Sequence, residues 1–320
     1  MTRTYSHDLI ALGRAYTDMI ATVNADFFSY NCLQPSGAVM VDENRLQELA
    51  TVLPNPILSF GGSSANVASV MAALGGQSCF GGKLRHDRAG EAFADDMHRR
   101  GVEFCWTPFI AGSGTSPTCL VLAQEADKEC SYVYNPGCAD WFEMAECAAL
   151  PVNATRFLLL EGFLLCGRAR EPLIELLSRA RGNCCIVINL QIGEWPGDDR
   201  MMNDVATYAD IIIGNKEEWA QFDPSNYVAS QSNCQHIITD GARGSLARCG
   251  NSEIFIPALS VPNLVSLLGA GDAYLAGLLY AMGRGSGTDD AMIFATKVAA
   301  AILMEVGARP SANFKSKILL

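Results

Sequence analysis

The chain has 320 residues, of which 49% are hydrophobic and 18% are charged. This apolar content is large enough to offset the entropy of ordering the chain, so an intrinsically disordered protein is excluded and a globular one is expected. The sequence carries 23 Lys and Arg against 34 Asp and Glu, a net charge of −11, which disfavours proteins that coat nucleic acids or bind anionic membrane surfaces.

Short apolar runs alternate with helical segments along most of the chain. Buried strands are expected at residues 9–13, 57–60, 157–160, 185–188, 211–213 and 236–239. Helices are expected at residues 64–74, 88–100, 171–181 and 216–222. Most runs are apolar without alternation, which indicates strands covered on both faces and therefore a mostly parallel sheet. The pattern predicts a single doubly wound α/β domain over residues 1–320.

Two segments interrupt this pattern. Residues 16–41 and 102–134 contain Thr, Val, Phe and Tyr with turn residues, and neither shows a convincing helix. We expect them to form β-strands that stand apart from the main sheet. They would serve as a lid over a ligand cleft or as a contact between two copies of the chain.

The C-terminal third is expected to end in two helices. Residues 272–282 are apolar almost all round, so the first helix should be deeply buried. Thr288 is expected to cap a second helix, which runs to about Val306 and stops at Gly307.

Twelve cysteines are scattered along the chain without a C-x-x-C pair. A chain of this length does not need disulfides, so small buried thiols in a reducing cytoplasm are the favoured interpretation. Four His and no paired Cys leave little from which to build a zinc site. The first residues lack the apolar run of a signal peptide, and no apolar run reaches the length of a membrane span. A cytoplasmic protein is therefore expected.

The segment Gly269-Ala270-Gly271-Asp272 leads into the first C-terminal helix. The first N–H groups of a helix have no partner within it, and glycine lets a ligand approach them, so this turn can bind phosphate without Lys or Arg. Asp272 would stand beside the anion, where a carboxylate can act as a general base toward an attacking hydroxyl. A plain Gly-Ala-Gly turn in which Asp272 caps the helix explains the same residues. Spacing alone does not choose between this structural role and a phosphate site with a base.

Two further segments follow expected strands and open helices. In Gly61-Gly62-Ser63-Ser64-Ala65-Asn66, the amide of Asn66 would point at a bound ligand, although an ordinary loop with a Ser cap has the same pattern. Asn215 and Glu218 lie three residues apart on one helix face and could hold Mg²⁺ through water near phosphates. A capping box between the two side chains is the simpler explanation.

Taken in order, these segments resemble the signatures of the PfkB, or ribokinase-like, family of ATP-dependent carbohydrate and nucleoside kinases. The N-terminal signature is similar to residues 61–68, and the C-terminal one to residues 269–272 with Ala276-Gly277. The family's N-x-x-E motif matches residues 215–218, and residues 239–244 resemble its nucleotide-side loop. Asp18 falls where the family has a carboxylate that binds substrate hydroxyls. The resemblance covers nearly the whole chain.

The resemblance implies a three-layer α/β/α fold with a small β-sheet lid, and transfer of the γ-phosphoryl group of ATP to a hydroxymethyl group of a sugar or nucleoside. It makes Asp272 the base and the backbone of Gly269, Ala270 and Gly271 the anion hole. The implied substrate-binding residues are Asp18, Gly61, Gly62, Asn66 and Glu161. The implied residues for ATP and Mg²⁺ are Asn215, Glu218, Thr239, Gly241 and Gly244, with Glu218 reaching the metal through water.

One departure from the family lies just before the C-terminal signature. Ser266-Leu267 stands where the family usually has Asp-Thr, in a region that helps many members bind an activating monovalent cation. Activation by K⁺ is therefore doubtful. The departure also leaves open a catalytically weakened member that binds nucleotide or sugar as a regulatory protein, although retention of Asp272 favours the active enzyme.

The partners implied by the resemblance are ATP and a small-molecule sugar or nucleoside, without nucleic acid or membrane. Leu160-Glu161-Gly162 and the tail segment Gly307-Ala308-Arg309-Pro310 resemble the adenosine-kinase-like branch, whereas Tyr134-Asn135-Pro136-Gly137 resembles the sugar-kinase branch. These signals conflict, so the resemblance predicts the reaction without choosing between a sugar and a nucleoside. A homodimer formed through the lid is a further possibility.

Overall fold

The computed structural model describes residues 5–35, 37–124, 130–191, 199–222 and 234–318. The larger of its two sheets has nine strands: β1 (His7–Leu12), β5 (Ser78–Gly81), β6 (Glu103–Phe104), β9 (Thr155–Glu161), β10 (Cys185–Asn189), β11 (Ile211–Asn215), β12 (Gln235–Thr239), β13 (Ser245–Cys249) and β14 (Ser252–Ile256). Their order is β14-β13-β12-β11-β10-β9-β1-β5-β6. Only β13 and β14, at one edge, pair antiparallel, so the expected mostly parallel sheet is confirmed.

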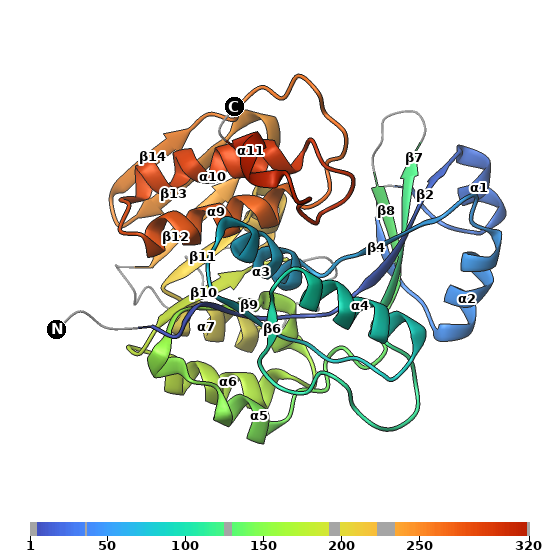
Figure 1. The fold of residues 1–320 in the computed structure, drawn as a ribbon, viewed down its shortest axis with the longest axis horizontal. Coiled ribbons are helices and arrows are strands. Elements are labelled where there is room, and N and C mark those ends of the chain that lie inside the picture. Colours follow the sequence, from blue (N-terminus) through green and yellow to red (C-terminus); the bar gives the residue numbers. More distant parts are fainter. Residues whose placement is uncertain (1–4, 36, 125–129, 192–198, 223–233, 319–320) are drawn as a thin grey trace.

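Helices cover both faces of this sheet (Figure 1). One face carries α3 (Ser63–Leu74), α4 (Arg88–Arg99), α9 (Ala270–Gly283), α10 (Thr288–Ile302) and α11 (Phe314–Ile318). The other face carries α5 (Met144–Ala149), α6 (Arg170–Ala180), α7 (Asp199–Tyr208) and α8 (Lys216–Gln221). Along β9, Phe157 and Leu159 pack in the first layer while Leu158 and Leu160 pack in the second. Continuous apolarity therefore arises because both faces of the strand are buried.

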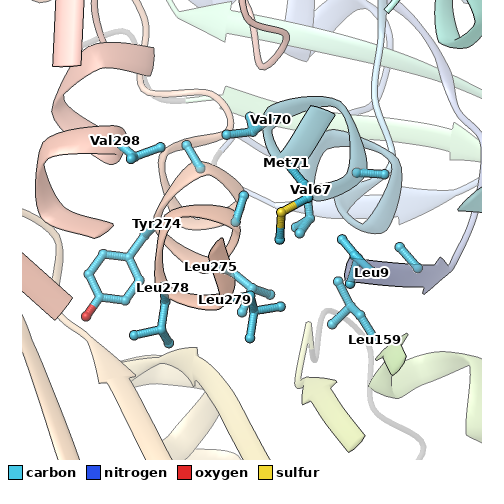
Figure 2. Packing of buried hydrophobic residues seen from close by; sticks show 14 of the residues in the cluster. Leu9, Val67, Val70, Met71, Leu159, Tyr274, Leu275, Leu278, Leu279 and Val298 are labelled. Atoms are coloured by element: carbon cyan, nitrogen blue, oxygen red, sulfur yellow. The ribbon is translucent and has the colours of Figure 1, made fainter. Parts of the chain in front are cut away.

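Helix α9 lies at the centre of the first layer. Its residues Leu275 and Leu279 are fully buried and face Met71 of α3 and Leu159 of the sheet, while Val298 of α10 lies on the other side of the helix (Figure 2). A helix enclosed in this way must be apolar all round, which confirms the burial expected from its sequence. The N-terminus of α9 is thereby fixed relative to α3 and to the sheet.

A second sheet stands beside the main one (Figure 1). It consists of β2 (Thr17–Val23), β3 (Ala38–Met40), β4 (Ile57–Phe60), β7 (Thr118–Gln124) and β8 (Cys130–Asn135), in the order β3-β8-β7-β2-β4. Helices α1 (Ala25–Tyr30) and α2 (Glu43–Val52) pack on one of its faces. We call this sheet with its two helices the lid.

Several boundaries differ from those expected. Residues 57–60 form β4 of the lid instead of a strand in the main sheet, because they pair antiparallel with β2. Residues 16–41 contain the unexpected helix α1, which Asn24 caps. Residues 103–104, expected to stand apart from the main sheet, form its edge strand β6 because they pair with β5. Helix α10 is capped by Gly287 instead of Thr288 and ends at Ile302, because the next N–H groups bond three residues back and tighten the last turn.

The lengths and composition of the helices bear on membrane association. Among those in the described ranges, none is long and apolar enough to cross a membrane.

Candidate active site

A cavity of about 540 Å³ lies between the lid and the carboxyl edge of the main sheet. Ligands of open α/β sheets bind outside this edge, because loops and helix N-termini converge there. Residues of the lid, of the loop after β1, of α3 and of α9 line the cavity together. Seven of the site residues expected from the sequence are part of its wall: Asp18, Gly61, Gly62, Asn66, Glu161, Gly269 and Asp272.

Asp272 lies in the first turn of α9, and its carboxylate is held by two side chains of α3. Ser63 Oγ donates to Oδ1 at 2.5 Å, and Asn66 Nδ2 donates to Oδ2 at 2.8 Å. Ser63 Oγ in turn accepts a hydrogen bond from Asn189 Nδ2 at 2.9 Å. Because each carboxylate oxygen has its own donor, the orientation of Asp272 is fixed before any ligand binds.

The electrostatic surroundings of Asp272 favour a base. Burial raises the pKa of this carboxyl group above its ordinary value, and the hydrogen bonds from Ser63 and Asn66, together with the charge of Arg309, oppose that rise. A carboxylate with a raised pKa is a better proton acceptor near neutral pH. Asp272 therefore has the position and the basicity to take a proton from a hydroxyl group in the cavity.

The N-terminus of α9 has the geometry of an anion site. Gly269 is the N-cap with φ of 76°, a left-handed conformation that favours glycine. A Cβ on Gly271 would meet no atom within 4 Å, so a ligand can approach the backbone there. The N–H groups of Gly269, Ala270, Gly271 and Asp272 have no helix carbonyl available to them, because the first intrahelical bond is that of the Ala273 N–H to Gly269. They can therefore bind phosphate oxygens with the help of the helix dipole.

Asp18 and Asn66 supply the polar part of the cavity wall next to Asp272. Burial raises the pKa of Asp18 to about 7, against the opposing charge of Arg309. Gly61 lies against this carboxylate so closely that a Cβ would stand 2.8 Å from Cγ of Asp18. Oδ1 of Asn66 is buried without a hydrogen-bond partner among the described residues. Both groups can accept hydrogen bonds from the hydroxyls of a ligand.

Glu161 ends β9 and has a partly structural role. Its Oε1 accepts from the Ser64 N–H at 2.8 Å, and its Oε2 accepts from the Arg14 N–H at 3.1 Å. These hydrogen bonds lower its pKa, but burial outweighs them and raises the pKa to about 7. Glu161 thus joins the loop after β1 to the start of α3 while it lines the cavity. Gly62, with φ of 84°, caps α3 next to this junction.

Asn215 and Glu218 form a capping box at the start of α8. Asn215 Oδ1 accepts from the Glu218 N–H at 2.8 Å, and Glu218 Oε2 accepts from the Asn215 N–H at 2.7 Å. The simpler explanation of this pair is therefore confirmed. It does not exclude a second role, because a capping Glu at the carboxyl edge of the sheet still presents negative charge there.

The remaining nucleotide-side residues lie in the turn after β12. Thr239 Oγ1 donates to the carbonyl of Gly214 at 3.4 Å. Gly241 and Gly244 have φ of 51° and 124°, so both require glycine-like backbone freedom. None of these residues, nor Asn215 or Glu218, lines the 540 Å³ cavity. The structure places all five at the carboxyl edge of β11 and β12, two to three strands from Glu161.

The donor set near Glu218 bears on whether Mg²⁺ fits. The described parts of the chain contain no group of three or more His, Cys, Asp or Glu arranged to hold a metal ion. Mg²⁺ commonly keeps several water ligands and is bound through one or two carboxylates together with substrate phosphates. Asn215 and Glu218 fit this kind of loose, water-mediated site.

Several residues of the site were not singled out in the sequence. Ser63 belongs to the glycine signature but lacked an assigned role, and Asn189 ends a buried strand just as Glu161 does, which was an available signal. Arg14 forms a bidentate pair with Asp140 through Nε and a terminal nitrogen, both at 2.7 Å. This contact joins residues far apart in the sequence, which no local pattern reveals.

Beside Asp18, the lid contributes a largely apolar wall to the cavity. Tyr16 and Tyr134 meet edge to face with ring centroids 6.1 Å apart, and Tyr132, Val121 and Met40 continue the wall. Aromatic and aliphatic side chains on the lid alternate between this cavity face and the face beneath α1 and α2. Only the pairing register of the lid strands reveals which residues face the cavity.

Comparison with known proteins is informative about the family. The profile of the pfkB family carbohydrate kinases matches residues 37–314. Aminoimidazole riboside kinase of Salmonella typhimurium is 27% identical over 247 residues, which are 73% of this chain and 76% of that one. The 5-dehydro-2-deoxygluconokinase of Bacillus subtilis is 23% identical over 315 residues, which are 92% and 90% of the two chains.

Solved structures share the fold. A probable sugar kinase from Rhizobium etli superposes with a TM-score of 0.86 at 22% identity, over 99% of this chain and 98% of its own. The adenosine kinase from Sinorhizobium meliloti also gives 0.86 at 22% identity, over 97% and 98%. Both similarities cover the lid as well as the main sheet.

Proposed function

Since this chain belongs to the pfkB family of carbohydrate kinases, which makes it a phosphotransferase with an alcohol group as acceptor, we propose that it transfers the γ-phosphoryl group of ATP to a hydroxymethyl group of a sugar or nucleoside. The observation that carries this proposal is the position of Asp272. Its partly buried carboxylate stands at the open N-terminus of α9, so a proton acceptor and a phosphate site would share one helix turn.

The proposed reaction uses groups of this chain in distinct roles. Asp272 accepts the proton of the acceptor hydroxyl while that oxygen forms a bond to the γ-phosphorus and the bond to the ADP oxygen breaks. The N–H groups of Gly269, Ala270 and Gly271 stabilise the negative charge on the transferred group. Mg²⁺, when bound with ATP, neutralises phosphate charge, and Asn215 and Glu218 would hold its water ligands. Thr239, Gly241 and Gly244 would border the nucleotide.

Binding of the acceptor falls to the polar wall of the cavity. Asp18 and Asn66 would accept hydrogen bonds from its hydroxyls, and Gly61 and Gly62 allow it to approach the backbone closely. Glu161 would hold this wall in place and contribute its carboxylate. The relatives include a riboside kinase and a gluconokinase, so the proposed acceptor class spans nucleosides and sugars.

The alternative is a catalytically weakened member that binds nucleotide or sugar as a regulatory protein. Ser266 favours it, because its Oγ accepts a hydrogen bond from the Leu268 N–H at 3.1 Å and a Ser-Leu pair offers fewer cation ligands than Asp-Thr. K⁺ is therefore not part of the proposed cofactor set. The complete set of contacts around Asp272 supports the active enzyme.

The lid and the thiols bear on assembly and location. Met40 and Ile57 of the lid are each 58% exposed, and we propose that a homodimer forms through this sheet, which the molar mass in solution would test. The cysteines whose side chains the structure describes form no disulfide, and this supports the cytoplasm as the proposed location.

Turnover with Mg-ATP and a panel of sugars and nucleosides tests the function. The wild-type chain should release ADP with at least one acceptor. Asp272→Asn should lower kcat by about 10²–10⁴-fold, the typical contribution of a general base, while the affinity for ATP stays close to wild type. ATP binding without turnover on any acceptor would favour the regulatory alternative, and full activity of Asp272→Asn would remove Asp272 as the base.

A further inference from the structure

Arg309 is a cation buried inside the fold, with 6% of its surface exposed. Its Nε donates to the carbonyl of Phe60 at 3.1 Å, and its two terminal nitrogens donate to the carbonyls of Ala65 at 2.9 Å and Gly61 at 3.0 Å. A further hydrogen bond goes to Ser69 Oγ. Four groups on one continuous stretch of chain, together with Met97 Sδ of α4 at 3.0 Å, therefore hold a single planar guanidinium in place.

These four acceptors mark the junction between the lid and the main domain. Phe60 ends lid strand β4, Gly61 belongs to the glycine turn, and Ala65 and Ser69 lie in α3. Strand β4 pairs with β2 such that Ser59 lies opposite Asp18. The same junction therefore sets the position of Asp18 on one side.

On the other side, the junction sets the position of the base. Helix α3 carries Ser63 and Asn66, which hold both oxygens of Asp272. Arg309 also follows Ala308, which lines the cavity and lies so close to Gly269 that a Cβ there would stand 2.7 Å from its Cα. The segment 308–309 thus contacts the start of α9 and the start of α3 at once.

We propose that Arg309 is a positioning residue, which clamps the lid junction to the C-terminal segment so that Asp18 and Asp272 face one cavity, and which places a buried positive charge near both carboxylates. This proposal rests on the proposed function for its kinetic consequence. Its structural basis, the set of hydrogen bonds to the junction, is independent of which acceptor the enzyme uses.

The charges around Arg309 support the electrostatic part of the proposal. Burial lowers the pKa of Arg309 to about 10, so the side chain remains protonated at neutral pH. Asp96, Asp18 and Asp272 raise that pKa, whereas Arg100 lowers it. The charge of Arg309 in turn lowers the pKa of both Asp18 and Asp272.

Among the described residues, Arg309 supplies the one positive charge that lowers the pKa of Asp18 and Asp272. The charge of Asp272 raises the pKa of Glu161 and of Tyr132, and Asp18 also raises the latter. Arg14 contributes a positive charge to Glu161 but forms its bidentate pair with Asp140. Loss of the Arg309 charge should therefore leave Asp18 and Asp272 harder to ionise.

Two substitutions distinguish the effect of the Arg309 hydrogen bonds from the effect of its positive charge. Arg309→Lys keeps a positive charge but loses the planar set of donors, whereas Arg309→Met loses both. We expect Arg309→Lys to lower kcat/KM by about tenfold or more, the cost of losing charged hydrogen bonds, with the acid limb of its pH profile close to wild type. Arg309→Met should lower kcat/KM further and move the acid limb to higher pH.

Arg100→Met is the matched control. Arg100 bonds the carbonyl of Pro310 at 2.7 Å and Asp96 at 2.8 Å, so it tethers the same C-terminal segment without touching the glycine turn. Its substitution should lower the melting temperature while kcat/KM stays within about twofold of wild type. Thermal unfolding of every variant is measured alongside.

A carboxyl ¹³C NMR titration of the apo protein gives a readout that needs no turnover, with Asp18→Asn to assign the Asp18 signal. Arg309→Met should raise the pKa of Asp18, and Arg309→Lys should leave it near wild type. If Arg309→Met does not fold, the test rests on Arg309→Lys, which should have a lower kcat/KM than wild type. If the wild type shows no turnover, Arg309→Lys should bind ATP more weakly than wild type. The proposal would be overturned if both Arg309→Lys and Arg309→Met kept the wild-type kcat/KM and the wild-type pKa of Asp18. An inactive wild-type protein would count only against the proposed function.

Discussion

Ser63 donates a hydrogen bond to Asp272 across 209 positions of sequence. The contact joins the N-termini of α3 and α9, the two helices that open from the glycine-rich segments. Asn66 completes the arrangement on the other carboxylate oxygen. The two segments that look alike in sequence thus face each other, and one of them orients the carboxylate of Asp272, our proposed base, on the other.

The first prediction concerns Ser63→Ala. Loss of its hydrogen bond should raise the pKa of Asp272, because that bond favours the charged carboxylate. We expect kcat/KM at neutral pH to fall by about tenfold, as for loss of a hydrogen bond to a charged group, and to recover in part at higher pH. The pH profile of kcat/KM is the measurement.

The control for this variant is Ser78→Ala. Ser78 is also buried, and its Oγ donates to the carbonyl of Ala68 at 2.9 Å in the same layer. It should lower stability without moving the acid limb of the profile. Equal pH profiles for Ser63→Ala and wild type would show that Ser63 does not tune the base.

The second prediction separates two glycines of the anion site. Gly271→Ala places a Cβ where no atom lies within 4 Å, so the fold should tolerate it while the methyl group obstructs phosphate. Gly269→Ala should destabilise the fold, because φ is 76° and the Cβ would stand 2.7 Å from Cα of Ala308. Thermal unfolding and ATP affinity are measured for both variants. Gly271→Ala should keep its melting temperature and lose affinity for ATP, whereas Gly269→Ala should have a lower melting temperature. A Gly271→Ala variant that binds ATP and turns over normally would exclude its backbone from the anion site.

The third prediction concerns stability and pH. The folded-state pKa values of Asp18 and Glu161 are raised to about 7, so the folded protein holds protons that the unfolded chain releases above pH 4. The contribution of these two groups to the free energy of unfolding should therefore fall as pH rises from about 4 to about 7, since they bind more protons in the folded state over that range.

Asp18→Asn tests this dependence. It removes a buried charge, so its melting temperature should exceed that of wild type by several degrees at pH 8 and by less at pH 5. Asp26→Asn, at an exposed position of α1, controls for loss of one negative charge at the surface. A constant difference between Asp18→Asn and wild type across this pH range would contradict the raised pKa.

The fourth prediction concerns Mg²⁺. Glu218→Gln preserves the capping box, because Gln can accept the same backbone hydrogen bond, but it removes the charge. We expect unchanged thermal stability and a higher Mg²⁺ concentration for half-maximal activity. EDTA should abolish turnover by wild type and variant alike. An unaltered Mg²⁺ requirement in Glu218→Gln would restrict Glu218 to its capping role.

The sequence alone predicted the elements whose signals are local. Continuous apolar runs at residues 157–160 and 185–188 identified strands buried on both faces, and the all-round apolarity of residues 272–282 identified a central helix. Glycine and Asp at the start of that helix pointed to a phosphate site and a base, because the chemistry resides in one short segment and its backbone N–H groups.

Tertiary structure decided everything that depends on pairing between distant segments. Residues 57–60 look like a main-sheet strand, but their antiparallel register with β2 assigns them to the lid. Asn189 and Arg309 reach their partners in the site across 126 and 248 positions of sequence, so only folding brings these groups together. The raised pKa values of Asp18 and Glu161 likewise arise from burial, which depends on the packing of lid, sheet and helices and not on neighbours in sequence.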